Sequence, residues 1–149
     1  SNTNNRSIFD VADGTAAVDL RVSAFITESA GGFGIEKTGA GLMLLEQNNT
    51  FSGLTHILGG RLQISEDLRL GTAPTAATAG KITFNNGGLL NTTATFTLNT
   101  NRGVALTGNG GFDVNSGTTL SYAGIIAGAG VLQKAGAGTL VLTAKRWGE

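Results

Sequence analysis

The segment Lys37-Thr-Gly-Ala-Gly-Leu-Met-Leu-Leu45 decides the fold, because a version of it occurs twice in the chain. It returns as Lys134-Ala-Gly-Ala-Gly-Thr-Leu-Val-Leu142, 97 residues further on. A second pair of similar segments, 5–8 and 101–104, lies 96 residues apart. We therefore interpret residues 1–149 as one repetitive segment: a long repeat over about 5–100, a partial second copy over about 101–142, and an atypical tail over 143–149.

The local pattern within this repeat is that of short β-strands. Apolar and polar residues alternate in several segments that are bounded by Gly, Asn, Ser or Thr. The clearest of these segments are 62–64, 82–84, 96–98, 104–106, 112–114 and 140–142. A helical turn is expected only at 65–70, ahead of Gly71. The sequence thus predicts an all-β protein without a long helix.

The composition excludes several classes of protein. The chain has 149 residues, 10 basic and 10 acidic side chains, and no cysteine. Disulfides and thiolate metal sites are therefore impossible, and no basic excess or basic run supports binding to nucleic acid. No stretch approaches the ~20 apolar residues of a membrane helix, so we expect no membrane insertion.

An ordered set of motifs follows the first glycine corner. Lys37–Gly41 and Leu44 are followed by Asn48-Asn-Thr-Phe-Ser-Gly53, by Thr55-His-Ile57, by Gly59-Gly-Arg-Leu-Gln-Ile64 and by Leu70-Gly71. This order resembles the autotransporter-associated β-strand repeat, also called the passenger-associated repeat, of bacterial surface proteins. The resemblance covers nearly the whole chain. The tail departs from it, because 143–149 stands where the pattern has N-x-[YF]-x-G.

The resemblance implies a right-handed parallel β-helix that is located outside the cell or on the bacterial outer-membrane surface. At 20–25 residues a coil, the chain would form six or seven coils, and the seven phenylalanines would lie inside at about one per coil. A globular β-sandwich is the rival fold. It would need antiparallel hairpins, for which 85–88 and 109–110 are the candidate turns.

Acidic residues are the only candidates for catalysis. Enzymes on β-helices use paired carboxylates, and Asp10, Asp13, Asp19 and the pair Glu66-Asp67 supply carboxylates here. We interpret all of them as strand ends, turns or solvated loops. A carbohydrate-active enzyme of the pectin lyase kind is the alternative, and it would require these acids to share a groove with an exposed aromatic residue. Only Tyr122 and Trp147 are candidates for that aromatic residue.

The remaining motifs favour structural roles. His56, the only histidine, should point outward from a strand and lacks the partners of a catalytic triad. The segment 31–36 resembles a calcium-binding nonapeptide but has no tandem copy to complete a site. Lys37 and Lys134 should point outward beside their glycine corners. The sequence thus predicts no catalytic, cofactor-binding or metal-binding residue, and no cofactor.

The predicted function is that of a non-catalytic structural or adhesive segment that forms a rigid rod. A filament-forming solenoid subunit is a further alternative. The expected partners are a host surface, a glycan or another copy of the chain. Because the open ends of a solenoid expose unpaired strand edges, we expect copies to associate end to end.

Overall fold

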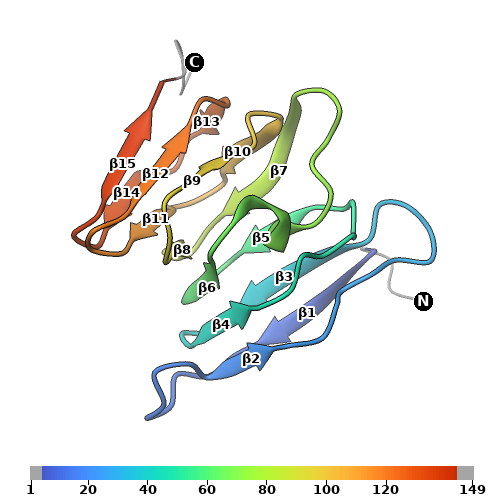
Figure 1. Ribbon diagram of the computed structural model, residues 1–149, viewed down its shortest axis with the longest axis horizontal. Coiled ribbons are helices and arrows are strands. Elements are labelled where there is room, and N and C mark those ends of the chain that lie inside the picture. The colour runs from blue at the N-terminus through green and yellow to red at the C-terminus, as the bar shows by residue number, and fades with distance from the viewer. Residues whose placement is uncertain (1–4, 144–149) are drawn as a thin grey trace.

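The computed structural model describes residues 5–143, which form three parallel sheets wound into a solenoid (Figure 1). These residues contain one 3₁₀ turn, η1 (Asp67–Leu70), and no α-helix. Sheet A consists of β1 (Arg6–Asp10), β3 (Gly34–Thr38), β5 (Thr55–Ile57), β7 (Thr78–Phe84), β10 (Arg102–Leu106) and β13 (Ile126–Gly128). Sheet B consists of β2 (Leu20–Val22), β4 (Leu42–Leu45), β6 (Arg61–Ile64), β8 (Gly88–Thr92), β11 (Gly110–Val114) and β14 (Leu132–Ala135). Sheet C consists of β9 (Phe96–Leu98), β12 (Thr119–Tyr122) and β15 (Thr139–Leu142).

The described residues make six coils, each with one strand in sheet A and one in sheet B. Neighbouring strands of a sheet are parallel in every pair, so the solenoid prediction is confirmed and the sandwich rival is wrong. The segment 85–88, a candidate hairpin turn, instead joins β7 of sheet A to β8 of sheet B. All six strand segments and the helical turn near residue 67 lie where the sequence predicted them.

The core lies between the sheets and is built from the inward residues of successive strands. Ile82, Val104 and Ile126 are register partners in neighbouring coils, and each is at most 2% exposed. The rings of Phe84 and Phe112 meet edge to face, with centroids 5.5 Å apart. Stacking of like residues at the strand spacing gives this core its regular rows.

The prediction that all seven phenylalanines lie inside is only partly confirmed. Phe51, Phe84 and Phe112 are fully buried, whereas Phe25 is 66% exposed. The remaining three, Phe9, Phe33 and Phe96, are partly buried against the core.

A buried asparagine links the early coils by hydrogen bonds on their third side, where sheet C has no strand. Asn49 accepts a hydrogen bond from the backbone N–H of Ile26 at 2.8 Å through Oδ1. Its Nδ2 donates to the carbonyl of Arg69 at 2.7 Å, so one side chain bridges three coils. Asn49 is the first residue of the N-x-F-x-G motif, and Gly53 is the last. Position 53 requires glycine, because a Cβ there would lie 2.3 Å from the carbonyl carbon of Phe33.

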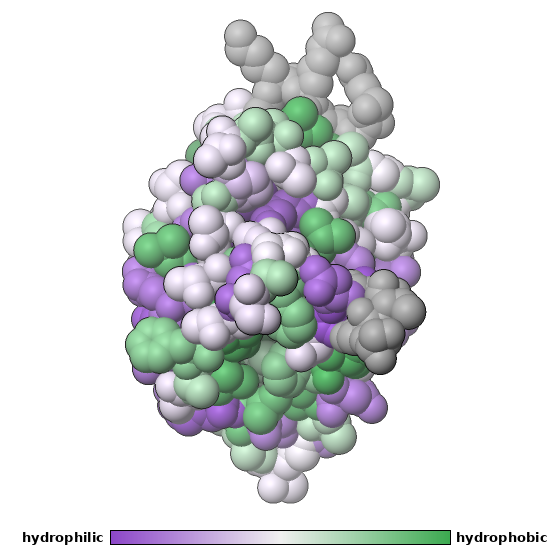
Figure 2. Space-filling view, turned by 90° about the vertical axis from the view of Figure 1, so that its right-hand side faces the viewer, coloured by the Kyte–Doolittle hydropathy of each residue, from purple (hydrophilic) through white to green (hydrophobic). Residues whose placement is uncertain are grey.

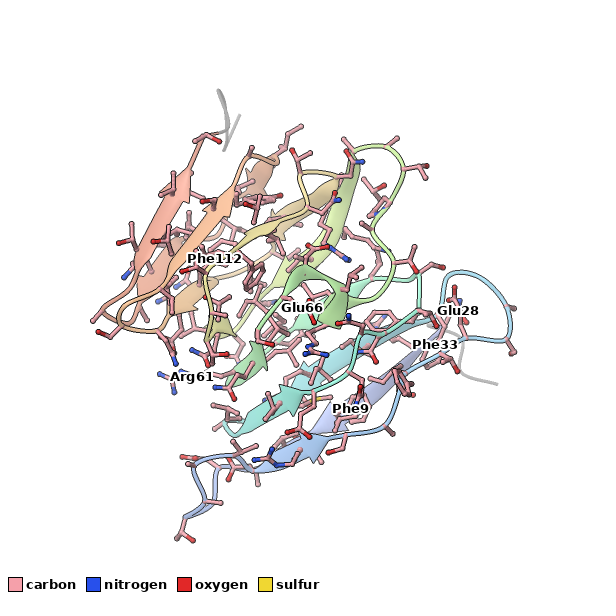
Figure 3. All side chains as sticks on the ribbon, in the orientation of Figure 1. Phe9, Glu28, Phe33, Arg61, Glu66 and Phe112 are labelled. Atoms are coloured by element: carbon pink, nitrogen blue, oxygen red, sulfur yellow. The ribbon has the colours of Figure 1, made fainter. Side chains whose placement is uncertain are left out.

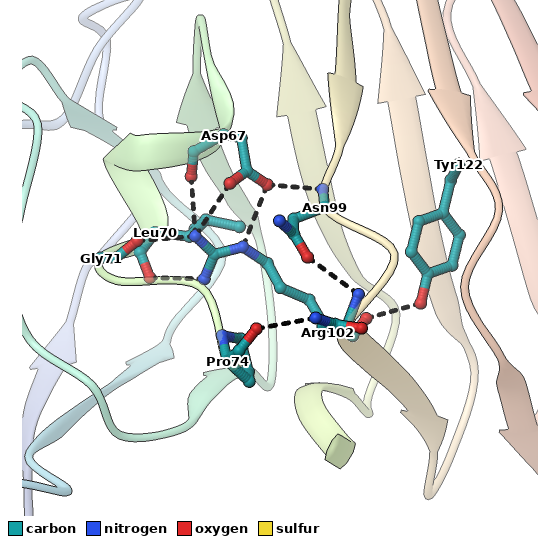
Figure 4. Close-up of polar contacts among 8 residues, drawn as sticks. Asp67, Leu70, Gly71, Pro74, Asn99, Arg102 and Tyr122 are labelled. Carbon is teal, nitrogen blue, oxygen red and sulfur yellow. Dashed lines mark hydrogen bonds and ion pairs between the residues drawn. The ribbon is translucent and has the colours of Figure 1, made fainter. Parts of the chain in front are cut away.

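Arg102 ties η1 to the later coils (Figure 4). Its guanidinium forms an ion pair with Asp67, and the Nε–Oδ1 and Nη2–Oδ2 distances are both 3.0 Å. It also donates to the carbonyls of Leu70 at 3.0 Å and Gly71 at 2.6 Å, which are the last carbonyls of the turn. The side chain is 1% exposed, so the Asp67 carboxylate and these carbonyls, rather than water, stabilise its charge.

Candidate binding surface

The first repeat corner is closed by a buried lysine. Lys37 is the register partner of Phe9 on β1, is fully buried, and points along the inner row rather than outward, so the sequence prediction for this residue was wrong. Its Nζ donates to the carbonyls of Thr38 and Gly39, both at 2.8 Å, and to Gly59 of the next coil at 3.1 Å. Burial lowers the pKa of Lys37. The amine therefore locks one coil to the next.

The second repeat copy builds the same corner at a different place. Lys134 is the register partner of Phe112, just as Lys37 is of Phe9, and both phenylalanines point toward the interior (Figure 3). Lys134 Nζ donates to the carbonyl of Gly136 at 2.5 Å. The first corner joins sheets A and B, whereas the second joins sheets B and C. The repeat motif thus forms the same kind of corner on two different sides of the solenoid.

The outer face of sheet A is charged over its first coils. Glu36 and His56 are register partners there. Arg6 Nε lies 2.5 Å from Glu36 Oε2, and His56 Nδ1 lies 3.7 Å from the same oxygen. Burial and then the nearby Arg6 guanidinium lower the pKa of His56, whereas Glu36 acts in the opposite direction. His56 therefore lies on the outer row, as predicted, within an ionic cluster.

The same outer face becomes small and apolar over the last coils. The row continues from His56 through Thr83 and Ala105 to Ala127. Beside it, between β7, β10 and β13, lies a pocket of about 190 Å³. Its lining includes Ala77, Ala79, Thr100, Val104, Ile125 and Ala127, and no charged residue. This volume suits a single apolar side chain of a partner.

Exposed apolar side chains lie on other parts of the surface as well. Ile8 and Phe25 of the first coil are 56% and 66% exposed, and Ile125 and Val131 of the last coil are 59% and 60% exposed. Figure 2 shows hydrophobic residues gathered in the lower half of one side, over the N-terminal coils. Only Ile125 of these four lines the pocket.

Two of the candidate acids lie at the first lysine corner: a Cβ on Gly39 would be 2.9 Å from Asp10 Oδ1, and a Cβ on Gly41 would be 2.9 Å from Asp19 Oδ2. Asp19 accepts hydrogen bonds from the backbone N–H of Gly14 at 2.8 Å and of Leu42 at 2.9 Å. The Leu42 bond, and after it the Gly14 bond, lowers the pKa of Asp19. Asp10 accepts from the Thr38 hydroxyl at 3.1 Å.

Two of the other candidate acids form ion pairs. Glu66 forms an ion pair with Arg69 at 3.2 Å, and Asp67 belongs to the Arg102 cluster. Asp13 is exposed. Each engaged carboxylate thus holds a turn or a neighbouring coil.

Neither candidate for the exposed aromatic residue of an enzyme is seen on the described surface. Tyr122, a candidate for the exposed aromatic residue that the enzyme alternative requires, is 1% exposed, and its hydroxyl donates to the carbonyl of Arg102 at 2.5 Å. Burial raises the pKa of Tyr122. Trp147 lies outside the described residues. Within 5–143 there is also no group of three His, Asp or Glu side chains placed to hold a metal ion, and 31–36 forms no such group.

Sequence reasoning missed two features of the structure. The pocket is lined mostly by Ala, Gly and Thr, which carry no chemical signal in a chain rich in these residues. The buried Arg102 is the second, because the sequence assigned it no role beyond its place in the repeated segment 101–104. Its similarity to Arg6 in the paired segments at 101–104 and 5–8 was the one signal that could have marked it.

The comparisons with known proteins agree with the corner geometry. Residues 35–64 and 132–145 match the model of the passenger-associated-transport-repeat, and each match contains one lysine corner. The chain carries the passenger-associated transport repeat. The Adhesin BmaC autotransporter of Brucella suis biovar 1 (strain 1330) is 40% identical over 136 residues, which cover 91% of this chain. No solved structure matches the chain.

The passenger-repeat chain is short beside that relative. It spans 4% of the length of the Brucella protein. The first family match runs from β3 to the end of β6, so it contains the lysine corner, Asn49 and the Gly59-Gly60 corner of the next coil. The hydrogen bond from Lys37 to the next coil therefore lies within one repeat motif, whereas Asn49 bonds to Ile26 and Arg69 on either side of it. No helix within 5–143 is long and apolar enough to span a bilayer.

Proposed function

We propose that this chain is a non-catalytic structural and adhesive segment of the passenger region of a surface-displayed or secreted bacterial protein. The observation that carries the proposal is the lysine corner, which occurs in both repeat copies and, in the first copy, joins one coil to the next. A segment built from such corners extends a rod. The name of the Brucella relative, an adhesin, supports the adhesive part of the proposal.

The placement of the acids supports the non-catalytic part. Paired-carboxylate chemistry needs two acids facing one substrate at about 5–9 Å. Here Asp19 caps backbone N–H groups, Glu66 pairs with Arg69, and Tyr122 is buried in the core. The pectin lyase-like alternative has no comparable support.

The partner is proposed to be a host surface, through a protein or a glycan, and the adhesive face is the outer face of sheet A. An Ile125→Asp substitution should reduce adhesion of beads coated with the chain to host cells by roughly five-fold or more, because it places a charge at the rim of the apolar pocket. The matched control is Val131→Asp. Val131 is 60% exposed against 59% for Ile125, but it does not line the pocket. Equal adhesion by the two variants would contradict the proposal that the outer face of sheet A is the adhesive face.

The same assay separates adhesion from catalysis. The double variant Asp10→Asn with Asp13→Asn should adhere like the unmodified chain, since neither residue lies at the pocket. Loss of a measurable polysaccharide hydrolase or lyase activity in this variant would overturn the non-catalytic proposal.

We further propose that rods associate end to end, as dimers or as a filament. Within the described residues, the strands β1 and β13 each have one unpaired edge in sheet A, and such edges template further strands. Deleting residues 144–149 should increase association, because it removes Lys145 and Arg146, two cations that follow the last strand. Sedimentation velocity over a concentration series measures this. A strict monomer at high concentration, for both forms, would refute the proposal.

A further inference from the structure

A shift in register between two central strands lies at the pocket on the outer face of sheet A. Between two neighbouring register pairs, residues 79–81 of β7 lie opposite the single residue Gly103 of β10. Such a β-bulge bends the strand that carries the extra residues and often lies beside a functional site. Both β7 and β10 are paired along each of their edges, so this bulge belongs to the middle of the sheet.

The lining of the pocket is shallow, because most of its residues carry at most a methyl group. Gly80, Gly103, Ala105 and Ala127 are among them. No larger residue fits at position 103, since a Cβ there would lie 2.6 Å from the carbonyl oxygen of Thr78. The pocket measures about 190 Å³. An apolar cavity of about 150 Å³ holds one benzene molecule, so this pocket has room for a six-membered ring and the carbon that attaches it.

The pocket offers few hydrogen-bonding groups. Among the described residues that line it, only Thr78 and Thr100 have polar side chains. The Thr78 hydroxyl already donates to the carbonyl of Ala76 at 3.0 Å. A sugar ring carries several hydroxyls, and each one that is buried without a partner costs free energy. The lining therefore favours an apolar ring over a sugar.

Charged groups lie on the same face at a distance from the pocket. The outer row runs from Ala127 through Ala105 and Thr83 to His56, which is three strand spacings or about 14 Å away. Arg6 and Glu36 form their ion pair beside His56. An apolar centre with a polar margin is the usual composition of an interface between proteins.

We propose that this pocket binds the phenylalanine ring of a protein on the host surface, so that the adhesive contact is made with polypeptide and not with glycan. The proposal rests on the proposed adhesive function of sheet A. The ring lies on the glycine and alanine lining at the bulge, and Ile125, which is 59% exposed, packs against it. Tyrosine and tryptophan fit less well, because their O–H and N–H groups need a partner when they are buried.

Binding of small probes to the full chain tests the choice of ring. N-acetylphenylalaninamide should shift the methyl resonances of Ile125 and Ala127 saturably in an NMR titration. N-acetyltyrosinamide, which enters the pocket with its hydroxyl first, should bind at least five-fold more weakly. Methyl β-glucoside should leave both resonances unchanged.

A variant that fills the pocket provides the control for these titrations. Ala105→Leu should abolish the binding of N-acetylphenylalaninamide, since its larger side chain occupies the lining. Ala123→Leu makes the same change at an exposed residue outside the lining and should leave the binding unchanged. Absence of binding, equal binding of the tyrosine probe, or binding that Ala105→Leu does not weaken would overturn the inference.

Adhesion of coated beads to host cells identifies the class of partner. The difference in adhesion between the unmodified chain and Ala105→Leu measures the contribution of the pocket. Protease treatment of the cells should abolish this difference, whereas periodate oxidation of their glycans should leave it unchanged. A difference that survives the protease, or that periodate removes, would overturn the inference and leave the adhesive face standing. If the two bead types adhere equally to untreated cells, the proposed adhesive function of this face is itself wrong.

Discussion

An Arg102→Met variant is expected to unfold with a free energy about 3–5 kcal/mol below that of the unmodified chain. The substitution keeps an unbranched apolar stem but removes the guanidinium, so Asp67 and the carbonyls of Leu70 and Gly71 lose their donor. These groups lie where the side chain is 1% exposed, and water replaces the lost bonds poorly. Urea denaturation followed by circular dichroism measures the difference.

The matched control is Arg61→Met. Arg61 Nε lies 2.6 Å from Asp113 Oδ2, a distance as short as those in the Arg102 cluster, but half of the arginine side chain is exposed. Its loss should cost about 0–1 kcal/mol. Similar losses for the two variants would show that burial does not determine the contribution of Arg102.

Replacing Gly60 with alanine should destabilise the chain by about 3 kcal/mol or more. Gly60 has a φ of +58°, and a Cβ there would lie 2.3 Å from the oxygen of Gly41 and 2.6 Å from that of Gly39. Both atoms belong to the backbone of the neighbouring coil, so the two coils would have to separate.

Gly117→Ala isolates the conformational part of this cost. Gly117 has a φ of +79°, but a Cβ there would meet nothing within 4 Å. Its replacement should cost only about 1–2 kcal/mol, the penalty of a left-handed alanine. The urea midpoints of the two variants give the comparison, and equal shifts would mean that the close approach of the coils contributes nothing.

The fold could be predicted because its signals are local and repeated. Alternation over three residues was enough to locate strands such as 82–84 and 112–114, and the recurrence of the lysine motif indicated stacking. The direction of the charged side chains could not be predicted in this way. Lys37 can be buried on the inner row because its Nζ donates to three carbonyls, those of Thr38 and Gly39 beside it and that of Gly59 in another coil. The sequence around Lys37 does not show that the folded backbone presents these acceptors to the amine.

The surface was predicted less well than the core. Phe25, which was expected inside, is exposed, and Tyr122, a candidate for the exposed aromatic residue of an enzyme, is buried. Tyr122 is buried because two backbone carbonyls, those of Arg102 and Ile125, satisfy its hydroxyl. The pocket beside Ile125 arises where strands from three coils meet, so its lining is contiguous only after folding.

The two lysine corners also show that repeat length does not fix where a corner lies. Arg6 and Arg102 both begin strands of sheet A, but Lys37 follows on the next strand of sheet A, whereas Lys134 lies on sheet B. The number of residues between arginine and lysine is nearly the same in both copies, because the paired segments are offset by 96 and 97 residues. In the second copy these residues form shorter coils that include a strand of sheet C, β12. Repeats of one length can thus present the same corner on different sides of a rod.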